Sequence, residues 1–404
     1  MNLAAHTPPG AFPVPLPRIS LSAWLLILPL ALSAFGCSRS EPARPAPKID
    51  AQRLQRELRK AVEDVGKSGV WIKDPPAGES ASQGVTLDRD VVVVSGSFER
   101  ALSAARHAAA REGTAMRVQT LRSTNGLRVA EARFVAGSHE VCRWNLREVR
   151  RICRAAIIID DLGNDAGAEK KLLELPYPLT YSVLPGLGHS ARTAENVFAH
   201  GREVMLHLPM EPEPGATSRP GPGEIQVGMT DQEVARTIAH DLATVPHARG
   251  VNNHMGSRAT ADPVLMAEVM RVLAQRRLFF VDSRTTAQST ALGVARRMGV
   301  PGFYRSVFLD DNESVDYSLG QLREFRRAAE EKGVAIAIGH PHPTTIRALR
   351  RFLPQLERDD IELVPASELL RAPEAARLSP PAERPSEYPA ASQRSAGATR
   401  LFEK

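Results

Sequence analysis

The chain of 404 residues has few aromatic residues, few cysteines and no clustered basic segment. Phe, Trp and Tyr make up 5% of the residues, and the 52 Lys and Arg, against 46 Asp and Glu, are scattered along the chain. Because nucleic-acid-binding proteins present clustered basic residues with interleaved aromatics, this composition argues against nucleic acid as a partner. The hydrophobic fraction of 43% is ample for a globular core.

Cysteine and glycine usage limit the chemistry further. The only cysteines are Cys37, Cys142 and Cys153. In an oxidising compartment Cys142 and Cys153 can pair, although Cys153 equally suits a small core position at the entrance of a strand, so the pairing stays open. No glycine-rich phosphate loop follows the apolar run that ends at Ile159, which argues against nucleotide binding.

The amino end has the pattern of an export signal. Arg18 precedes an apolar segment, Ile19–Phe35, and small residues stand just before Cys37. This arrangement resembles a bacterial lipoprotein signal, in which the cysteine is lipidated and becomes the new amino terminus. An uncleaved membrane anchor and ordinary signal-peptide cleavage are the alternatives. All three predict a protein of the periplasm or cell envelope, and the first predicts membrane anchoring at Cys37.

Composition divides the chain into five parts. We expect a signal peptide over 1–37, a Pro/Ala-rich tether over 38–50, a small α+β domain over 51–154, a (β/α) barrel domain over 155–371 and a disordered tail over 372–404. No residues of the small domain suggest chemistry, so we expect it to pack, space or bind a partner. Its predicted elements are a helix over Asp50–Val65, a strand over Val91–Val94, a helix over Glu99–Arg111, and strands over Met116–Leu121, Leu127–Val135 and His139–Leu146.

From Ala155 onward, apolar strand-like runs alternate with helical stretches. The predicted strands are Ala156–Ile159, Leu179–Leu184, Glu203–Leu206, Gly250–Asn253, Leu278–Val281, Val334–Ile338 and Ile361–Val364. Asp262 before Pro263 predicts a helix start, with a capping side chain followed by proline in the first helical position. Seven such units predict an α/β fold, a distorted or incomplete seven-stranded (β/α) barrel, with an open doubly wound sheet as the alternative.

Polar clusters follow five of these strands. They are Asp160–Asp161, His207–Pro212, Asn252–Ser257, Asp282–Arg284 and His340–Pro343. Since the carboxyl ends of parallel strands meet at one edge, a single shared site satisfies all of these buried polar groups. Carboxylate and imidazole together suit a divalent transition metal such as zinc. A second carboxylate can then act as a base and a further histidine as an acid.

Four of these segments resemble the divergent branch of the NodB-type polysaccharide deacetylases, in the glycoside hydrolase/deacetylase superfamily. They are Ile-Asp-Asp-Leu-Gly from Ile159, His-Leu-Pro-Met-Glu-Pro from His207, Asn-Asn-His-Met-Gly-Ser from Asn252 and Gly-His-Pro-His-Pro from Gly339. The resemblance covers Ala155 to Leu370. It implies metal-dependent hydrolysis of N- or O-acetyl groups on peptidoglycan or an exported glycan.

The resemblance also implies roles for four residues. Asp160 would be the general base and His340 the general acid, while Asp161 and His207 would hold the metal. Where the conventional family has its second histidine, this chain has Glu211. The third ligand is therefore open: we favour His254 from the next strand, with Glu211 as the alternative and a weakly held metal as a third case. If the metal is only weakly held, the alternative function is that of a catalytically weak or inactive protein that binds glycan or protein.

Further polar residues at the strand ends are expected to bind or orient substrate. Asn252 and Asn253 can orient substrate or donate to an oxyanion, although turn chemistry explains them equally well. We expect Asp282 to pair with Arg284 or to orient His340, and His342 to lie beside the substrate. Asp310 and Asp311 are expected only to cap the segment that follows them.

Overall fold

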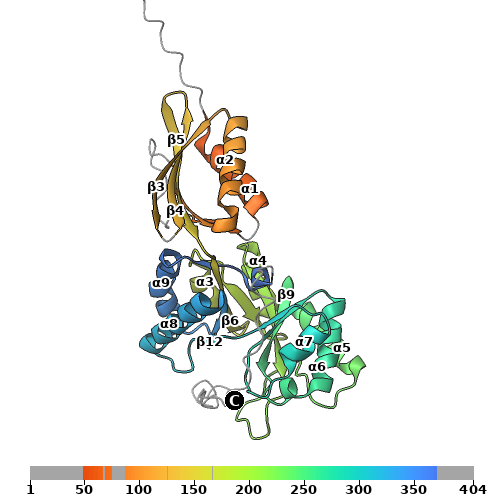
Figure 1. The fold of residues 1–404 in the computed structure, drawn as a ribbon. Helices are drawn as coiled ribbons and strands as arrows, with labels where there is room; N and C mark the ends of the chain where they lie inside the picture. Colours follow the sequence, from red (N-terminus) through yellow and green to blue (C-terminus); the bar gives the residue numbers. More distant parts are fainter. Residues whose placement is uncertain (1–48, 67–68, 75–86, 125, 166, 371–404) are drawn as a thin grey trace, which may run out of the picture. The chain divides into compact units, whose positions relative to one another are not determined.

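A computed structural model describes residues 49–66, 69–74, 87–124, 126–165 and 167–370 (Figure 1). The predicted signal peptide with Cys37 lies outside these residues, as do most of the predicted tether and the whole predicted tail. Among the helices that are described, none is long and apolar enough to cross a membrane.

The first sheet has five strands in the order β1-β2-β5-β4-β3. β2 and β5 are parallel, and the other neighbours are antiparallel. Its strands are β1 (Val70–Ile72), β2 (Leu87–Val94), β3 (Ala115–Thr124), β4 (Leu127–Ala136) and β5 (His139–Val149), and its helices are α1 (Ala51–Gly66) and α2 (Phe98–Arg111), with the 3₁₀ helix η2 (Ser95–Ser97). All elements predicted here are present, whereas β1, only three residues long, was not predicted.

The two helices cover one face of the first sheet (Figure 1). Leu54 and Leu58 of α1 pack in one apolar cluster with Trp144 of β5, whose Nε1 donates to Gln55 Oε1 at 3.1 Å. Cys142 lies in the same cluster, and burial raises the pKa of its thiol to about 12. No disulfide joins Cys142 to Cys153.

The second sheet begins at residue 153, and all its strand pairs are parallel. The main order is β11-β10-β9-β8-β7-β6-β13-β12. Its strands are β6 (Cys153–Leu162), β7 (Thr180–Val183), β8 (Glu203–Met210), β9 (Ala248–Met255), β10 (Phe279–Asp282), β11 (Gly302–Tyr304), β12 (Val307–Phe308), β13 (Val334–Gly339) and β14 (Ile361–Leu363).

Helices connect these strands, as the alternating pattern predicted. They are α3 (Ala168–Leu173), α4 (Ser190–Ala199), α5 (Asp231–Thr244), η3 (Ala259–Ala261), α6 (Pro263–Gln275), α7 (Ala291–Arg297), α8 (Val315–Lys332), α9 (Pro343–Arg358) and α10 (Ala366–Leu369). The predicted start of α6 is confirmed: Asp262 Oδ1 accepts hydrogen bonds from the backbone N–H groups of Val264 and Leu265, both at 2.9 Å.

The second sheet curls into an incomplete barrel. Its end strands β11 and β12 are separated along the chain only by Arg305 and Ser306. The Arg305 N–H donates to the Asp282 carbonyl at the end of β10, and the Ser306 N–H donates to the Ile336 carbonyl in β13. The chain thus passes directly from one edge of the sheet to the other, although no ladder joins β11 to β12 in the described part. The predicted fold class is confirmed.

The structure adds two details that the strand prediction did not contain. The predicted strand Ile361–Val364 exists as β14, but it pairs only with the start of β6 and lies off the main order. The edge segment 302–308 was not predicted. Its two strands have three and two residues, too few to give a periodic signal in the sequence.

The strand β6 is buried on both faces. Ala155, Ile157 and Ile159 belong to the cluster that packs against the surrounding helices. Ala156 and Ile158 instead join side chains of four other strands of the sheet and α10 in an inner cluster that fills the barrel. This two-sided burial explains why the sequence of β6 is a continuous apolar run rather than an alternating one.

A buried acid on α5 makes stability depend on pH. Asp241 is 1% exposed, its Oδ2 has no hydrogen-bond partner in the described part, and burial raises its pKa to about 7. The unfolded chain releases this proton near pH 4, so the folded protein holds one more proton between about pH 4 and pH 7, and stability falls as the pH rises through that range.

We therefore expect Asp241→Asn to raise the free energy of unfolding at pH 8 by up to a few kcal/mol and to have little effect near pH 4, since one pKa unit corresponds to about 1.4 kcal/mol. Urea denaturation of both proteins at the two pH values measures the difference. An equal gain at both pH values would contradict a role for this proton.

Candidate metal centre and active site

The polar residues at the strand ends continue the inward-facing rows of the barrel. In β6, Ile158 belongs to the inner apolar cluster, and Asp160 stands two residues later on the same face. In β8, Met205 and His207 have the same relation. His340 likewise follows the inward-facing Ile338 of β13. The apolar filling of the barrel therefore gives way to a polar layer at its carboxyl end.

Asp161 reaches the same layer by a different route. Adjacent residues of a regular strand point to opposite faces, so Asp161 would otherwise point away from Asp160. The register between β6 and β7 shifts between Ile159 and Leu162, and Asp161 has a φ of +57°. This bulge turns the second carboxylate toward the first, and such a left-handed conformation in a non-glycine residue is typical of functional sites.

Three side-chain atoms meet beside this bulge. Nε2 of His207 lies 3.2 Å from Oδ1 of Asp161, and Nδ1 of His254 lies 3.1 Å from that oxygen. The two imidazole nitrogens are 3.1 Å apart. A tetrahedral zinc with bonds of about 2.0–2.1 Å holds its ligand atoms about 3.3–3.4 Å apart. The triangle of Asp161, His207 and His254 therefore fits one divalent metal.

The oxygen at the corner of the triangle is buried. Asp161 Oδ1 has no hydrogen bond that meets geometric criteria among the described residues, although both imidazole nitrogens lie within 3.2 Å of it. Burial alone would raise the pKa of Asp161, but the imidazoles of His207 and His254 outweigh it and hold the pKa well below its usual range. A buried, ionised oxygen facing two ring nitrogens is the donor set that zinc prefers.

Asn252 of β9 links the metal triangle to the second acid. It is fully buried, and its Nδ2 donates to both carboxylate oxygens of Asp160, at 2.9 and 3.0 Å. Its Oδ1 lies 3.1 Å from Nδ1 of His207 and accepts from Ser182. The amide oxygen thus holds the His207 proton on Nδ1 and leaves Nε2 free to bind metal. Asn252 is too deep to contact substrate directly, so its amide orients Asp160 and His207 instead.

Asp160 itself is 3% exposed, and its Oδ2 lies 3.6 Å from His207 Nε2. Burial raises the pKa of Asp160, although the nearby His207 and His340 work in the opposite direction. A carboxylate with a raised pKa is a stronger base than a surface aspartate.

His340 is held by a carboxylate that the sequence did not reveal. Its Nδ1 lies 3.0 Å from Oδ1 of Asp310, and its backbone N–H donates to Oδ2 at 2.6 Å. Thr345 also donates to that Oδ2, at 2.6 Å. Burial would lower the pKa of His340, but Asp310 and the other nearby acids outweigh it and raise the pKa to about 10. The opposite ring nitrogen, Nε2, points to the metal triangle and lies 3.6 Å from Asp161 Oδ2.

One expectation about the acids was therefore wrong: Asp310 does not merely cap the following segment, because it pairs with His340. Of the two partners left open for Asp282, the structure shows Arg284, whose backbone N–H donates to Oδ1 at 2.8 Å, while Ser289 Oγ donates to Oδ2. Asp310 follows the short strand β12, so missing that strand meant missing this strand-end acid as well.

Glu211 lies outside the metal triangle. Its Oε2 accepts from the Val227 N–H at 2.7 Å, and its Oε1 pairs with Arg258. Its carbonyl accepts from the N–H groups of Arg258 and Ala259. Glu211 thus ties together the loops that follow β8 and β9. The sequence left His254 and Glu211 as candidates for the third ligand. The structure brings His254, and not Glu211, to Asp161 and His207.

The remaining predicted residues have varied surroundings. Asn253 donates to the Met255 carbonyl and accepts from the Ser283 N–H, which is the turn chemistry considered as its alternative role. The guanidinium of Arg284 lies over the Tyr304 ring, and no recorded contact joins it to the metal triangle. His342 lies beside His340, with ring centroids 5.7 Å apart.

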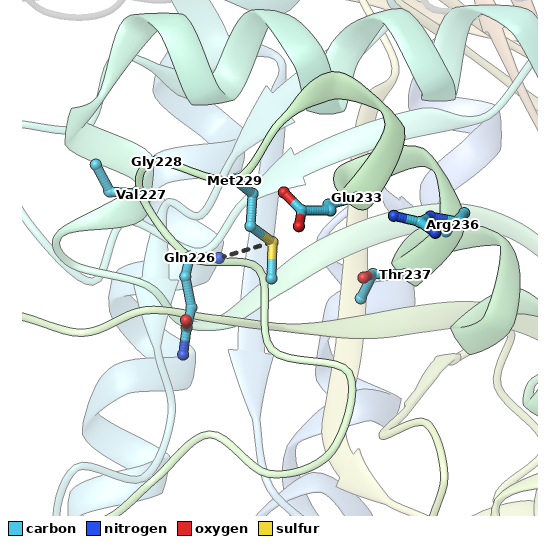
Figure 2. A pocket seen from close by; sticks show the side chains of 7 residues that line it. All are labelled: Gln226, Val227, Gly228, Met229, Glu233, Arg236 and Thr237. Atoms are coloured by element: carbon cyan, nitrogen blue, oxygen red, sulfur yellow. Dashed lines mark hydrogen bonds between the residues drawn. The ribbon is translucent and has the colours of Figure 1, made fainter.

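A surface hollow of about 470 Å³ lies between the loop Gln226–Met229 and α5. Figure 2 shows its lining side chains, among them Glu233, Arg236 and Thr237 of α5. None of the predicted site residues lines it, and Glu233 is already engaged in capping its own helix. The hollow is therefore distinct from the metal triangle.

Sequence comparison identifies the class to which this fold and site belong. The profile of the divergent polysaccharide deacetylases matches residues 157–370, more than half of the chain. The chain therefore belongs to the divergent polysaccharide deacetylase family, and metal dependence is a property of the wider deacetylase group.

Three similar proteins are all described as uncharacterized. The uncharacterized protein YibQ of Escherichia coli (strain K12) is 36% identical over 229 residues, which are 56% of this chain and 70% of that protein. An uncharacterized protein of Haemophilus influenzae is 36% identical over 222 residues, 54% of this chain and 77% of that protein. The crystal structure of an uncharacterized protein from Agrobacterium tumefaciens C58 is 26% identical, with a TM-score of 0.52, and covers 54% of this chain and 89% of that one.

The buried amide of Asn252 offers a direct test of the metal site. We expect Asn252→Ala to weaken zinc binding by about 10- to 100-fold, because His207 loses the partner that fixes its ring. Asn253→Ala is the matched control: it removes the neighbouring buried amide, so it should lower the melting temperature while leaving zinc affinity nearly unchanged. Competition titration with a chromogenic chelator measures both. Equal losses of affinity would contradict the role given to Asn252.

Proposed function

We propose that this protein is a metal-dependent hydrolase that removes acetyl groups from a polysaccharide of the cell envelope. The observation that carries the proposal is the triangle of Asp161, His207 and His254, flanked by Asp160 and His340. These are the parts that acyl hydrolysis requires, a metal position with a base and an acid beside it.

Asp161, His207 and His254 would hold the metal, and zinc is the ion that best suits one carboxylate and two imidazoles. When bound, the metal supplies a Lewis acid that polarises the acyl carbonyl and makes water more acidic. Asn252 keeps the His207 ring in the metal-binding tautomer, and Asp310 orients the ring of His340.

The proton transfers are divided between two residues. Asp160 accepts a proton from the attacking water while the water oxygen bonds to the acetyl carbon. The bond from that carbon to the amine nitrogen or hydroxyl oxygen of the sugar then breaks, and His340 Nε2 gives its proton to the departing atom. The products are the deacetylated sugar and acetic acid, which loses its proton to solvent and leaves as acetate. Before the next turnover Asp160 gives its proton to solvent or to His340, and His340 regains one from Asp160 or from solvent.

The competing proposal was an inactive protein that binds glycan, which rested on Glu211 standing in place of a histidine. His254 supplies an imidazole at the metal triangle, and Glu211 has partners of its own, so that substitution no longer argues for inactivity. On the basis of the amino-terminal sequence, we also propose an envelope location with anchoring at Cys37.

The two adjacent acids should have separable roles. We expect Asp160→Asn to lower the rate of acetate release from N-acetylglucosamine oligomers by about two to four orders of magnitude while zinc content stays near that of the wild type. Asp161→Asn should lose the zinc itself. Zinc analysis beside the acetate assay distinguishes them, and loss of zinc in Asp160→Asn would mean that the two roles are exchanged. Retained glycan binding without zinc or acetate release in the wild type would support the inactive protein instead.

The Asp310–His340 pair predicts a change in pH dependence. Asp310 raises the pKa of His340, so its loss lowers that pKa, and the acid loses its proton at a lower pH. We expect Asp310→Asn to lower kcat and to move the alkaline limb of the kcat profile to lower pH. Glu211→Gln is a useful comparison, since it should leave both zinc content and that limb in place. An alkaline limb unchanged in Asp310→Asn would contradict this assignment of the acid.

A further inference from the structure

The described residues contain a second group of potential metal ligands beside the metal triangle. Asp310, His340 and His342 each offer one ligand atom, and these atoms lie within 4.8 Å of one another. We call this group the second cluster. It shares no ligand residue with Asp161, His207 and His254, and it uses the Nδ1 side of the His340 ring, away from Asp161.

Two members of the second cluster already stand at a ligand separation. Nδ1 of His340 and Oδ1 of Asp310 are 3.0 Å apart, close to the separation of two ligands on one tetrahedral ion. The carboxylate is held in place through its other oxygen, which accepts from Thr345 Oγ1 and the His340 N–H, both at 2.6 Å. Among the described residues Oδ1 accepts a hydrogen bond only from His340, so a lone pair remains for an ion.

The third member is less firmly held. The His342 side chain is 36% exposed, and its Nδ1 lies 3.8 Å from Glu313 Oε1, which is too far for a hydrogen bond. Its ring lies beside that of His340, with centroids 5.7 Å apart, so it stands within reach of an ion at Asp310 and His340. Glu313, 67% exposed, stands next to it and can supply a fourth donor atom. Two imidazoles and two carboxylates form a complete tetrahedral set for zinc.

We propose that Asp310, His340 and His342 form a second, weaker zinc site, with Glu313 as its fourth donor, and that occupation of this site inhibits the enzyme. The affinity is lower than at the metal triangle because His342 and Glu313 must be ordered when the ion binds, whereas Asp161, His207 and His254 already meet at 3.1–3.2 Å.

The inhibition follows from the proton balance of His340 and rests on the proposed function. Zinc at Nδ1 displaces the proton of that nitrogen to solvent. The hydrogen bond between Nδ1 and Asp310 is lost, because both groups now bind the ion. The ring is then a neutral ligand, and its Nε2–H is a much weaker acid than the same group of an imidazolium. Protonation of the departing amine or hydroxyl is therefore slowed. The binding of the second zinc does not depend on the activity.

A zinc titration of the metal-free full-length protein tests the site. We expect the wild type to bind one zinc ion tightly at the metal triangle and a second zinc ion more weakly at the second cluster, which includes His342. His342→Gln should lose the weaker equivalent and keep the tight one, and Asp161→Ala should do the reverse. His107→Gln removes an exposed histidine of α2 and should match the wild type. An identical stoichiometry in His342→Gln and the wild type would overturn the site.

Acetate release measured over the same range of zinc concentration tests the inhibition. For the wild type we expect the rate of acetate release to rise until one equivalent of zinc is bound and then to fall by at least tenfold. For His342→Gln we expect the rate to rise to a maximum and to stay there as more zinc is added. A falling limb that persists in His342→Gln would overturn the inhibition. Absence of acetate release at every zinc concentration would count against the proposed function, whereas the two-equivalent stoichiometry would still decide the second site.

Discussion

The carboxyl end of β6 must direct two adjacent carboxylates toward one point, and a regular strand cannot do this. The bulge between Ile159 and Leu162, with the left-handed Asp161, solves the problem locally. The rest of the centre depends on it. If Asp161 pointed outward, His207 and His254 would face each other across 3.1 Å without an acid between them. The rigid, doubly buried run before the bulge keeps this strained turn in place.

Polar residues at this depth are stable only as a connected set, since each buried group needs a partner. Asn252 provides most of the connections, because its single amide satisfies Asp160 and His207 at once and also contacts Ser182 and Ser283. Asp310 has a similar position on the other wall, between His340 and Thr345. Two buried residues, Asn252 and Asp310, thus set the orientation of the side chains that we propose as the base, one metal ligand and the acid.

Much of this arrangement can be predicted from sequence, where the signal is periodic. The apolar run before Asp160 predicts β6, and the polar clusters after successive strands predict a shared site at one end of a barrel. The sequence does not reveal the bulge, because a positive φ at an aspartate leaves no pattern. It also hides Asp310, which follows a strand of two residues, and the partner of Glu211, because Arg258 meets it only in the folded chain.

The three atoms of the metal triangle come from three different strands, and His207 and His254 are 47 positions apart in the chain. An unfolded chain holds such distant groups around one ion far less readily than the folded protein, so metal affinity belongs mainly to the folded state. Metal binding and folding are then thermodynamically linked: bound zinc would raise the free energy of unfolding by RT ln(1 + [Zn]/Kd), where [Zn] is the free zinc concentration. A compartment poor in zinc would therefore leave the protein more readily unfolded and degraded.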